Sequence, residues 1–226
     1  MSGPFGKAFE LLVTGDREVW FITWTSLRFS LSSTLIACLP GIPLGVMIGL
    51  RRFRGRRPVL AVLNSLMALP TVVVGLMVYS LISRSGPLGA LGLLFTPGAV
   101  IIGQAILALP IVMSMTASSL SRLDPLFPEV LTTLGAGTRD ILWMSVREAR
   151  GPVLSACLAA FGRVVGEVGA AMMLGGNIRW YTRTITTAIA LETGKGEFEL
   201  GLALGIILMA MALGVNALLH WAVKHE

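Results

Sequence analysis

The sequence predicts an all-α integral membrane protein with about five transmembrane helices. Of its 226 residues, 54% are hydrophobic and 13% are charged, whereas soluble domains usually contain about 25% charged residues. Long apolar stretches recur along the whole chain, and a helix needs about 20 mostly apolar residues to cross a bilayer. We therefore expect residues 1–226 to form a single transmembrane domain.

Five apolar stretches are long enough to cross a bilayer. They are Val19–Leu50, Val59–Ile82, Pro97–Leu120, Val153–Leu174 and Leu200–Val223. Proline occurs within the first three, in LPGIPLG at 39–45 and in ALP at 68–70 and 108–110. Because proline removes a backbone N–H and clashes with the preceding helical turn, we expect each of these three spans to be broken. Two interpretations stay open: kinks that packing absorbs, or kinks that line a polar path.

Glycines spaced four residues apart occur in three of the stretches. The sets are Gly41, Gly45 and Gly49, then Gly162 and Gly166, and then Gly201 and Gly205. Small residues at this spacing let two helices approach closely in a membrane. The pattern predicts a tightly packed bundle or dimer.

The positions of the arginines predict the orientation in the cytoplasmic (inner) membrane. Loop 51–58 contains five arginines and loop 121–152 contains four, whereas loop 83–96 contains only Arg84. Basic loops stay in the cytoplasm, so we expect the N-terminus outside and the C-terminus inside. This clustering of the net charge of +6 favours membrane topology over nucleic-acid binding. On the outer side, TITTAIALE at 184–192 is too short to span and predicts an interfacial or re-entrant helix.

The stretch VLTTLGAGTRDILWMSVREARGP at 130–152 is too charged for a span and too apolar for a solvated loop. Gly135 and Gly137 divide it into two short helices, and Thr138 is placed to cap the second. Ile141, Leu142 and Trp143 form an apolar surface beside basic residues. Two interpretations stay open: a docking surface for a cytoplasmic partner, or a helix lying on the bilayer.

This loop is where the sequence resembles a known family. EVLTTLGAGTRDILWMSVREARGPVLSA at 129–156 resembles the loop of ABC-importer permeases that docks onto a cytoplasmic ATPase. The usual glutamate-alanine-alanine opening is Glu129-Val130-Leu131 here. FGRVVGEVGAAMMLGGN at 161–177 is similar to the molybdate, sulfate and tungstate branch. VTGDREVWFITWTSLRFSLS at 13–32 and SRSGPLGALGLLFTP at 83–97 look most like tungstate-type permeases.

The resemblance implies a type I importer fold and a set of partners. These are a second permease chain, two cytoplasmic ATPases, an extracytoplasmic oxyanion-binding protein and membrane lipid. The cargo would be a tetrahedral oxyanion, most simply tungstate, with molybdate or sulfate as the alternative. In this scheme 121–152 is the cytoplasmic coupling loop, and its docking residues are Glu129, Leu134, Gly135, Ala136, Arg139, Ile141, Leu142 and Trp143.

The sequence itself predicts no enzyme and no cofactor bound by this chain. It contains no G-x-x-x-x-G-K-[ST] phosphate loop, so ATP and Mg²⁺ are expected on a partner ATPase. Cys38 and Cys157 lie in apolar stretches, and no spacing predicts a metal site or disulfide framework. His220 and His225 have no acidic or nucleophilic partner nearby in the sequence. An ATPase-independent channel or secondary transporter stays as the rival class.

Two groups of residues are candidates for the transport path. Ionisable residues within a span are costly, and Arg163 and Glu167 are spaced so that they meet on one helix face. With Gly166 and Gly169 they form either a gate or a pair that locks helix packing. Outside, a cationic mouth is predicted from Asn177, Arg179, Thr182, Arg183 and Thr184. The alternative is that nearby glutamates neutralise this segment.

Overall fold

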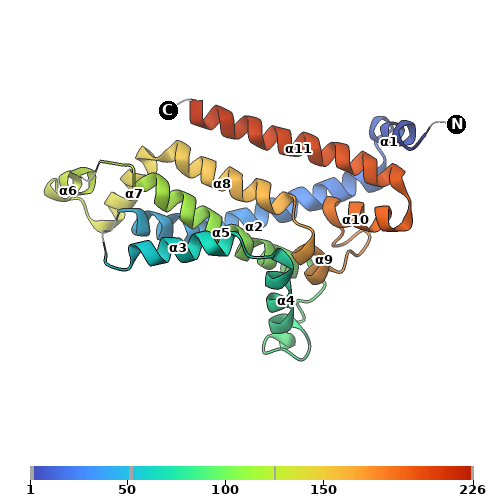
Figure 1. Ribbon diagram of the computed structural model, residues 1–226, viewed down its shortest axis with the longest axis horizontal. Helices are drawn as coiled ribbons and strands as arrows, with labels where there is room; N and C mark the ends of the chain where they lie inside the picture. Colours follow the sequence, from blue (N-terminus) through green and yellow to red (C-terminus); the bar gives the residue numbers. More distant parts are fainter. Residues whose placement is uncertain (1–2, 51–52, 125, 225–226) are drawn as a thin grey trace.

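The computed structural model describes residues 3–50, 53–124 and 126–224, and every regular element in that part of the chain is helical. The α-helices are α1 (Pro4–Val13), α2 (Arg17–Leu50), α3 (Arg56–Met67), α4 (Thr71–Ile82), α5 (Pro97–Leu120), α6 (Leu126–Thr133), α7 (Thr138–Glu148), α8 (Arg150–Val165), α9 (Gly169–Gly175), α10 (Ile185–Lys195) and α11 (Phe198–Lys224). A single 3₁₀ turn, Gly89–Leu91, lies among these described elements. Figure 1 shows the long helices running along the long axis, with the two termini at opposite ends.

The membrane-crossing helices are of two kinds. Helices α2, α5 and α11 are each long and apolar enough to span a bilayer alone. The other two predicted spans are bent pairs: α3 and α4 meet at 93°, and α8 and α9 meet at 64°. The described helices therefore provide three continuous spans, or five if each bent pair is one span. Figure 1 shows α4 turning away from the direction of the long helices.

Proline breaks only one of the three spans in which a break was predicted. Pro70 lies at the bend between α3 and α4, as expected. The predictions for LPGIPLG and for the second ALP were wrong, because α2 continues through Pro40 and Pro43 and α5 continues through Pro110. Proline costs a helix one hydrogen bond and some steric strain, and packing against a neighbouring helix can offset that cost.

The glycine ladder of α2 (Gly41, Gly45 and Gly49) packs closely against α5. A Cβ atom on Gly41 would lie 2.9 Å from Val112 Cγ1, and one on Gly45 would lie 2.9 Å from the Met113 carbonyl oxygen. A Cβ on Gly49 would lie 2.7 Å from Leu120 Cβ. The prediction of close helix packing is therefore confirmed for this ladder, whose partner is α5. The other two pairs show no such row of close approaches, since Gly166 and Gly205 meet no neighbouring helix within 4 Å.

Two short helices complete the end of the molecule near the N-terminus. The predicted outer helix is α10, and its Ile185 and Ala188 are buried in a cluster with α2 and α11. Helix α1 was not predicted. Its Ala8 is buried, while Phe5, Phe9 and Val13, spaced four residues apart, are 66–73% exposed. Such a stripe is typical of a helix that lies in the membrane interface.

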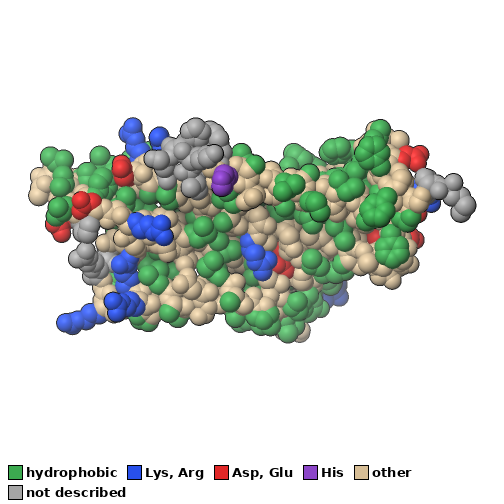
Figure 2. All heavy atoms as spheres, turned by 45° about the horizontal axis from the view of Figure 1, so that its top comes forward, with side chains coloured by type: hydrophobic (Ala, Val, Ile, Leu, Met, Phe, Trp, Pro, Cys, Tyr) green, Lys and Arg blue, Asp and Glu red, His purple; other side chains and the backbone are tan. Residues whose placement is uncertain are grey.

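The opposite end contains α6 and α7 and is rich in arginine. Arg56 donates hydrogen bonds to the carbonyl oxygens of Ile48 and Gly49 and to the Ser121 hydroxyl, which joins the ends of α2 and α5. Figure 2 shows Lys and Arg side chains gathering mainly towards this end of the visible face. Of the five arginines in loop 51–58, Arg51 and Arg52 lie outside the described residues. We call this end of the molecule the arginine-rich end.

Candidate functional site

The loop between α5 and α8 folds into two short helices that project at the arginine-rich end. The predicted break is confirmed: α6 ends at Thr133, α7 begins at Thr138, and Gly135 has φ +85°, a conformation that favours glycine. The prediction that Thr138 caps the second helix was wrong, because Thr138 is the first residue of α7. Gly137 is the N-cap, and its backbone N–H donates to the Asp140 carboxylate at 3.0 Å. This acidic group also suits the positive end of the helix dipole.

Helix α7 has two faces with different surroundings. Leu142 and Val146 pack against a buried cluster that includes Val46, Leu120 and Val153, so α7 is attached to the ends of the long helices. Trp143, on the other face, is 70% exposed, and Leu134 just before α7 is 77% exposed. Large apolar side chains exposed at a surface can mark an interaction site.

The predicted docking residues divide between these two faces. Leu134, Trp143 and the charged Glu129 and Arg139 are exposed, and Gly135 lies exposed between the two helices. Ala136, Ile141 and Leu142 are half-buried. The loop therefore presents an apolar and charged surface outward while its half-buried residues fix the position of α7.

The bend between α8 and α9 brings the predicted gate residues together. Arg163 Nη1 donates to Glu167 Oε2 at 3.1 Å, across one turn. Glu167 Oε1 accepts a hydrogen bond from the Ala170 backbone N–H at 3.0 Å, at the start of α9. Gly169 lies where a Cβ would approach Val72 of α4 to 2.7 Å. The Glu167 carboxylate thus pairs with the Arg163 guanidinium of α8 and also accepts a hydrogen bond from a backbone N–H at the start of α9.

A buried polar network satisfies the backbone groups that this bend exposes. Thr186 Oγ1 donates to the Glu167 carbonyl oxygen at 2.6 Å, and Gln104 Nε2 donates to the Val164 carbonyl oxygen at 3.3 Å. Ser33 Oγ donates to Gln104 Oε1 at 3.2 Å. Backbone groups without partners are costly in an apolar medium, so the network makes an irregular backbone tolerable at this depth. Helices α2, α5 and α10 each supply one of its hydroxyl or amide groups.

The exposure of the ion pair is uneven. The Glu167 side chain is 2% exposed and that of Arg163 is 41% exposed. A guanidinium within a span is expected to face protein or water and to avoid lipid tails. The free side of Arg163 therefore marks a face of α8 that an assembled protein would cover or that would border water.

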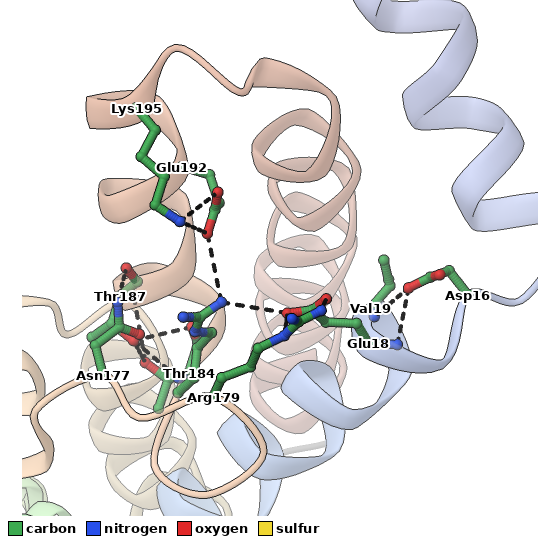
Figure 3. Close-up of polar contacts among 10 residues, drawn as sticks. Asp16, Glu18, Val19, Asn177, Arg179, Thr184, Thr187, Glu192 and Lys195 are labelled. Atoms are coloured by element: carbon green, nitrogen blue, oxygen red, sulfur yellow. Dashed lines mark hydrogen bonds and ion pairs between the residues drawn. The ribbon is translucent and has the colours of Figure 1, made fainter.

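The predicted outer mouth is a segment closed by ion pairs. Arg179 donates two hydrogen bonds to the Glu18 carboxylate, and Arg183 lies 3.3 Å from Glu18 Oε1 and 3.5 Å from Glu192 Oε1. Figure 3 shows Arg179 directed at Glu18, and Lys195 beside Glu192. Lys195 pairs with Glu192 at 3.2 Å. The hydrogen bond and the charge of Glu18 raise the pKa of Arg179, so it stays cationic.

The hydroxyl and amide groups of this segment are also engaged internally. Thr182 Oγ1 donates to the Gly175 carbonyl oxygen, and the Thr184 hydroxyl caps α10 by accepting from the Thr187 N–H. Asn177, at φ +50°, donates to the Thr187 carbonyl oxygen at 3.2 Å. In this conformation the segment's threonines and arginines stabilise its fold, and they are not arranged as free donors around a mouth.

Sequence reasoning did not identify three participants in these networks. Gln104 and Ser33 look like ordinary polar residues in apolar stretches, although a polar residue at that depth is itself a signal for a buried partner. Glu18 is 165 positions from Arg183, so no local spacing could connect them. Cys38 Sγ and Cys157 Sγ also lie 3.2 Å apart across α2 and α8, which no sequence spacing predicted.

The fold and these sites define a class of protein: a helical membrane component with an exposed helical loop between α5 and α8 and no metal-binding cluster among its described residues. Residues 41–225 match the family model described as binding-protein-dependent transport system inner membrane component. The chain belongs to this family.

Three relatives match nearly the whole chain. A probable anion ABC transporter permease protein of Haloferax volcanii is 44% identical, covering 92% of this chain and 93% of that protein. The tungstate uptake system permease protein TupB of Peptoclostridium acidaminophilum is 39% identical, covering 96% of this chain and 95% of its own. The protein of the same name from Campylobacter jejuni is 40% identical, and the match covers 96% of this chain and 90% of that protein.

Solved structures support the fold. A chain of the methionine ABC transporter MetNI in an inward-facing conformation superposes with a TM-score of 0.72, covering 100% of this chain and 99% of that one. Its sequence identity is 20%, so the likeness establishes the architecture alone. The predicted type I importer permease fold is confirmed.

Proposed function

We propose that this chain forms the translocation path of an ATP-driven importer of tungstate. The principal support is the full-length similarity, at 39–40% identity, to permeases named for tungstate uptake. Relatives named for molybdenum or sulfate transport match less of the chain at lower identity, so these oxyanions are the second choice of cargo. A tetrahedral oxyanion is common to all of these names.

Partner ATPases supply the energy in this proposal. The exposed surface of Leu134, Trp143 and Arg139 is where we place the contact with each of two cytoplasmic ATPase subunits. The buried side of α7 reaches the cluster around Val46, Leu120 and Val153, at the ends of α2, α5 and α8. A displacement of α7 would therefore be transmitted directly to membrane-crossing helices. ATP and Mg²⁺ bind to those subunits in this scheme.

A second copy of the chain completes the path. Helix α4 exposes Val72, Leu76 and Met77, and α8 exposes Arg163 on its free side. A homodimer would cover part of this surface and leave Arg163 beside an aqueous route between the copies. Dianions on this route would pass Arg163, whose charge is partly offset by Glu167. Because the remaining attraction is weak, the dianion would pass and would not bind tightly.

The proposed orientation places the arginine-rich end in the cytoplasm and the N-terminus outside. The basic side chains at the α6–α7 end support this through the tendency of basic loops to remain inside. At the other end, the segment held by Glu18, Arg183 and Glu192 would face an extracytoplasmic oxyanion-binding protein. Its ion pairs make it a firm platform for that contact.

The proposal is tested by uptake into proteoliposomes that contain this chain and its ATPase, with the binding protein outside and ATP inside. We expect accumulation of radioactive tungstate that depends on ATP and is competed less well by sulfate. Uptake that is equal without the ATPase would establish the rival class, a channel or secondary transporter. Uptake of sulfate or molybdate in place of tungstate would correct the cargo.

A further inference from the structure

A cavity lies at the arginine-rich end, between α5, α7 and α8. Its volume is about 1040 Å³. Six polar or charged residues line it: Ser119, Arg122, Arg147, Glu148, Arg150 and Ser155. Since a water molecule occupies about 30 Å³, the cavity holds a hydrated ion with space to spare.

The charge of this cavity is positive and has no ion-pair partner among the described residues. Arg122, Arg147 and Arg150 form no ion pair or side-chain hydrogen bond with any residue that the structure describes. Arg179 and Arg183 at the other end contrast with this, because both are paired with carboxylates. Three arginines against Glu148 leave a formal charge of +2, equal and opposite to that of a dianion.

Two further features of the wall favour an anion. Ser155 is 91% buried, and its hydroxyl has no hydrogen-bond partner among the described residues. Helix α8 begins at Arg150 in this wall, and no side chain caps its N-terminus. A hydroxyl donor without a protein partner and the positive end of a helix dipole both favour a phosphate-like ion.

We infer that this cavity binds a tetrahedral oxyanion, at a site on the inner side of the path that is distinct from the Arg163–Glu167 bend. The identity of the ion rests on the proposed function: the transported dianion would occupy the cavity after translocation. The exposure of all three arginines implies weak, hydrated binding that falls as salt concentration rises. An internal site of this kind makes the permease itself sensitive to accumulated product, because an occupied cavity opposes further release.

The same chemistry could come from a lipid, since a phosphodiester headgroup is also a tetrahedral oxyanion. The test therefore uses the full chain in nanodiscs of two compositions: phosphatidylcholine alone, and phosphatidylcholine with phosphatidylglycerol. Binding of tungstate, sulfate and inorganic phosphate is measured by equilibrium dialysis. Native mass spectrometry measures retained phosphatidylglycerol.

The variants separate the cavity from general charge effects. Arg150→Gln and Arg147→Gln remove one cavity charge each, while Arg54→Gln removes an exposed arginine elsewhere at the same end. Ser155→Ala removes the unfulfilled hydroxyl. Its control is Ser145→Ala, because the Ser145 hydroxyl is also buried and without a partner among the described residues, and Ser145 does not line the cavity. Monodisperse elution and unchanged helical circular dichroism show that each variant is folded.

We expect tungstate to bind in phosphatidylcholine nanodiscs about tenfold more weakly in Arg147→Gln and in Arg150→Gln, because each loses a charge-assisted hydrogen bond to the ion. Ser155→Ala should weaken binding two- to tenfold, and both controls should leave it unchanged. The site would be assigned to a lipid phosphate if phosphatidylglycerol competes with tungstate in the wild-type chain and is no longer retained by the cavity variants. The ligand would still be a tetrahedral oxyanion. Binding of neither ion nor lipid, or binding unaffected by the cavity variants, would overturn the inference.

The outcome is separable from that of the proposed function. If the complete transporter imports tungstate but the cavity variants bind it normally, the cavity inference fails and the function stands. If no tungstate is imported while phosphate or sulfate binds in a cavity-dependent way, the function fails and the oxyanion site stands.

Discussion

Arg163 and Glu167 form an ion pair of 3.1 Å in which the carboxylate is 2% exposed and the guanidinium side chain 41% exposed. The carboxylate also accepts from the Ala170 N–H, and the Glu167 carbonyl accepts from Thr186. Glu167 therefore joins α8, α9 and α10 at the bend of a membrane span. Any movement of this bend must alter the surroundings of Arg163.

Neutralising Glu167 should leave the Arg163 charge without its partner. We expect Glu167→Gln to lower the free energy of unfolding by about 1–3 kcal/mol, since the amide oxygen still accepts from Ala170 while the ion pair is lost. The double variant Arg163→Met/Glu167→Gln should recover most of that stability, as measured by thermal unfolding in detergent. Uptake that recovers with stability would show a structural pair. A stable double variant without uptake would show that the charges act in gating.

Bulk on the α2 glycine ladder should separate α2 from α5. A side chain at Gly45 meets Thr116 Cβ at 2.8 Å and the Met113 carbonyl oxygen at 2.9 Å, so Gly45→Leu should cost about 1–3 kcal/mol or more. For a chain of this size each kcal/mol lowers the Tm by roughly 2–4 °C. Gly214→Leu on α11 is the matched control, because a Cβ there meets nothing within 4 Å. Equal Tm values for the two variants would contradict the packing of α2 on α5.

The conformation of Gly135 should matter for coupling and little for the spans. Its φ of +85° costs a β-branched residue about 1–2 kcal/mol, whereas asparagine tolerates the left-handed region. We expect Gly135→Val to reduce binding-protein-stimulated ATP hydrolysis about tenfold and Gly135→Asn to keep most of it. The chain's own Tm should change by only a few degrees. Full stimulation with valine would argue against α6 and α7 as the docking elements.

Oxidation should join Cys38 to Cys157 within one chain. Their sulfur atoms lie 3.2 Å apart, in α2 and α8. Copper phenanthroline with oxygen would take two electrons and two protons from the thiols and leave a disulfide. We expect both cysteines to lose reactivity with a maleimide while the chain remains a monomer on denaturing gels, and each single Cys→Ala variant to stay reactive. Persistent labelling of the oxidised wild-type chain would contradict the packing of these helices.

The sequence predicted elements well where the signal was long or local. Apolar length located the membrane stretches, and glycine spacing located the contact of α2 with α5. Helix breaks were harder, because Pro70 breaks a span and Pro110 does not, and only tertiary packing distinguishes them. At the bend, Arg163 and Glu167 were recognisable by their four-residue spacing. Glu18 and Gln104 were missed because their partners are distant in sequence.

We propose that this chain couples ATP hydrolysis on a partner to the import of tungstate. The most direct measurement is the ATPase activity of the complex reconstituted from this chain, its ATPase and its binding protein, with tungstate, molybdate and sulfate each presented on that binding protein. The account predicts stimulation by tungstate that exceeds that by the other two ions and that falls when Trp143 is replaced by alanine. A stable complex whose activity responds to none of the three ions would contradict it.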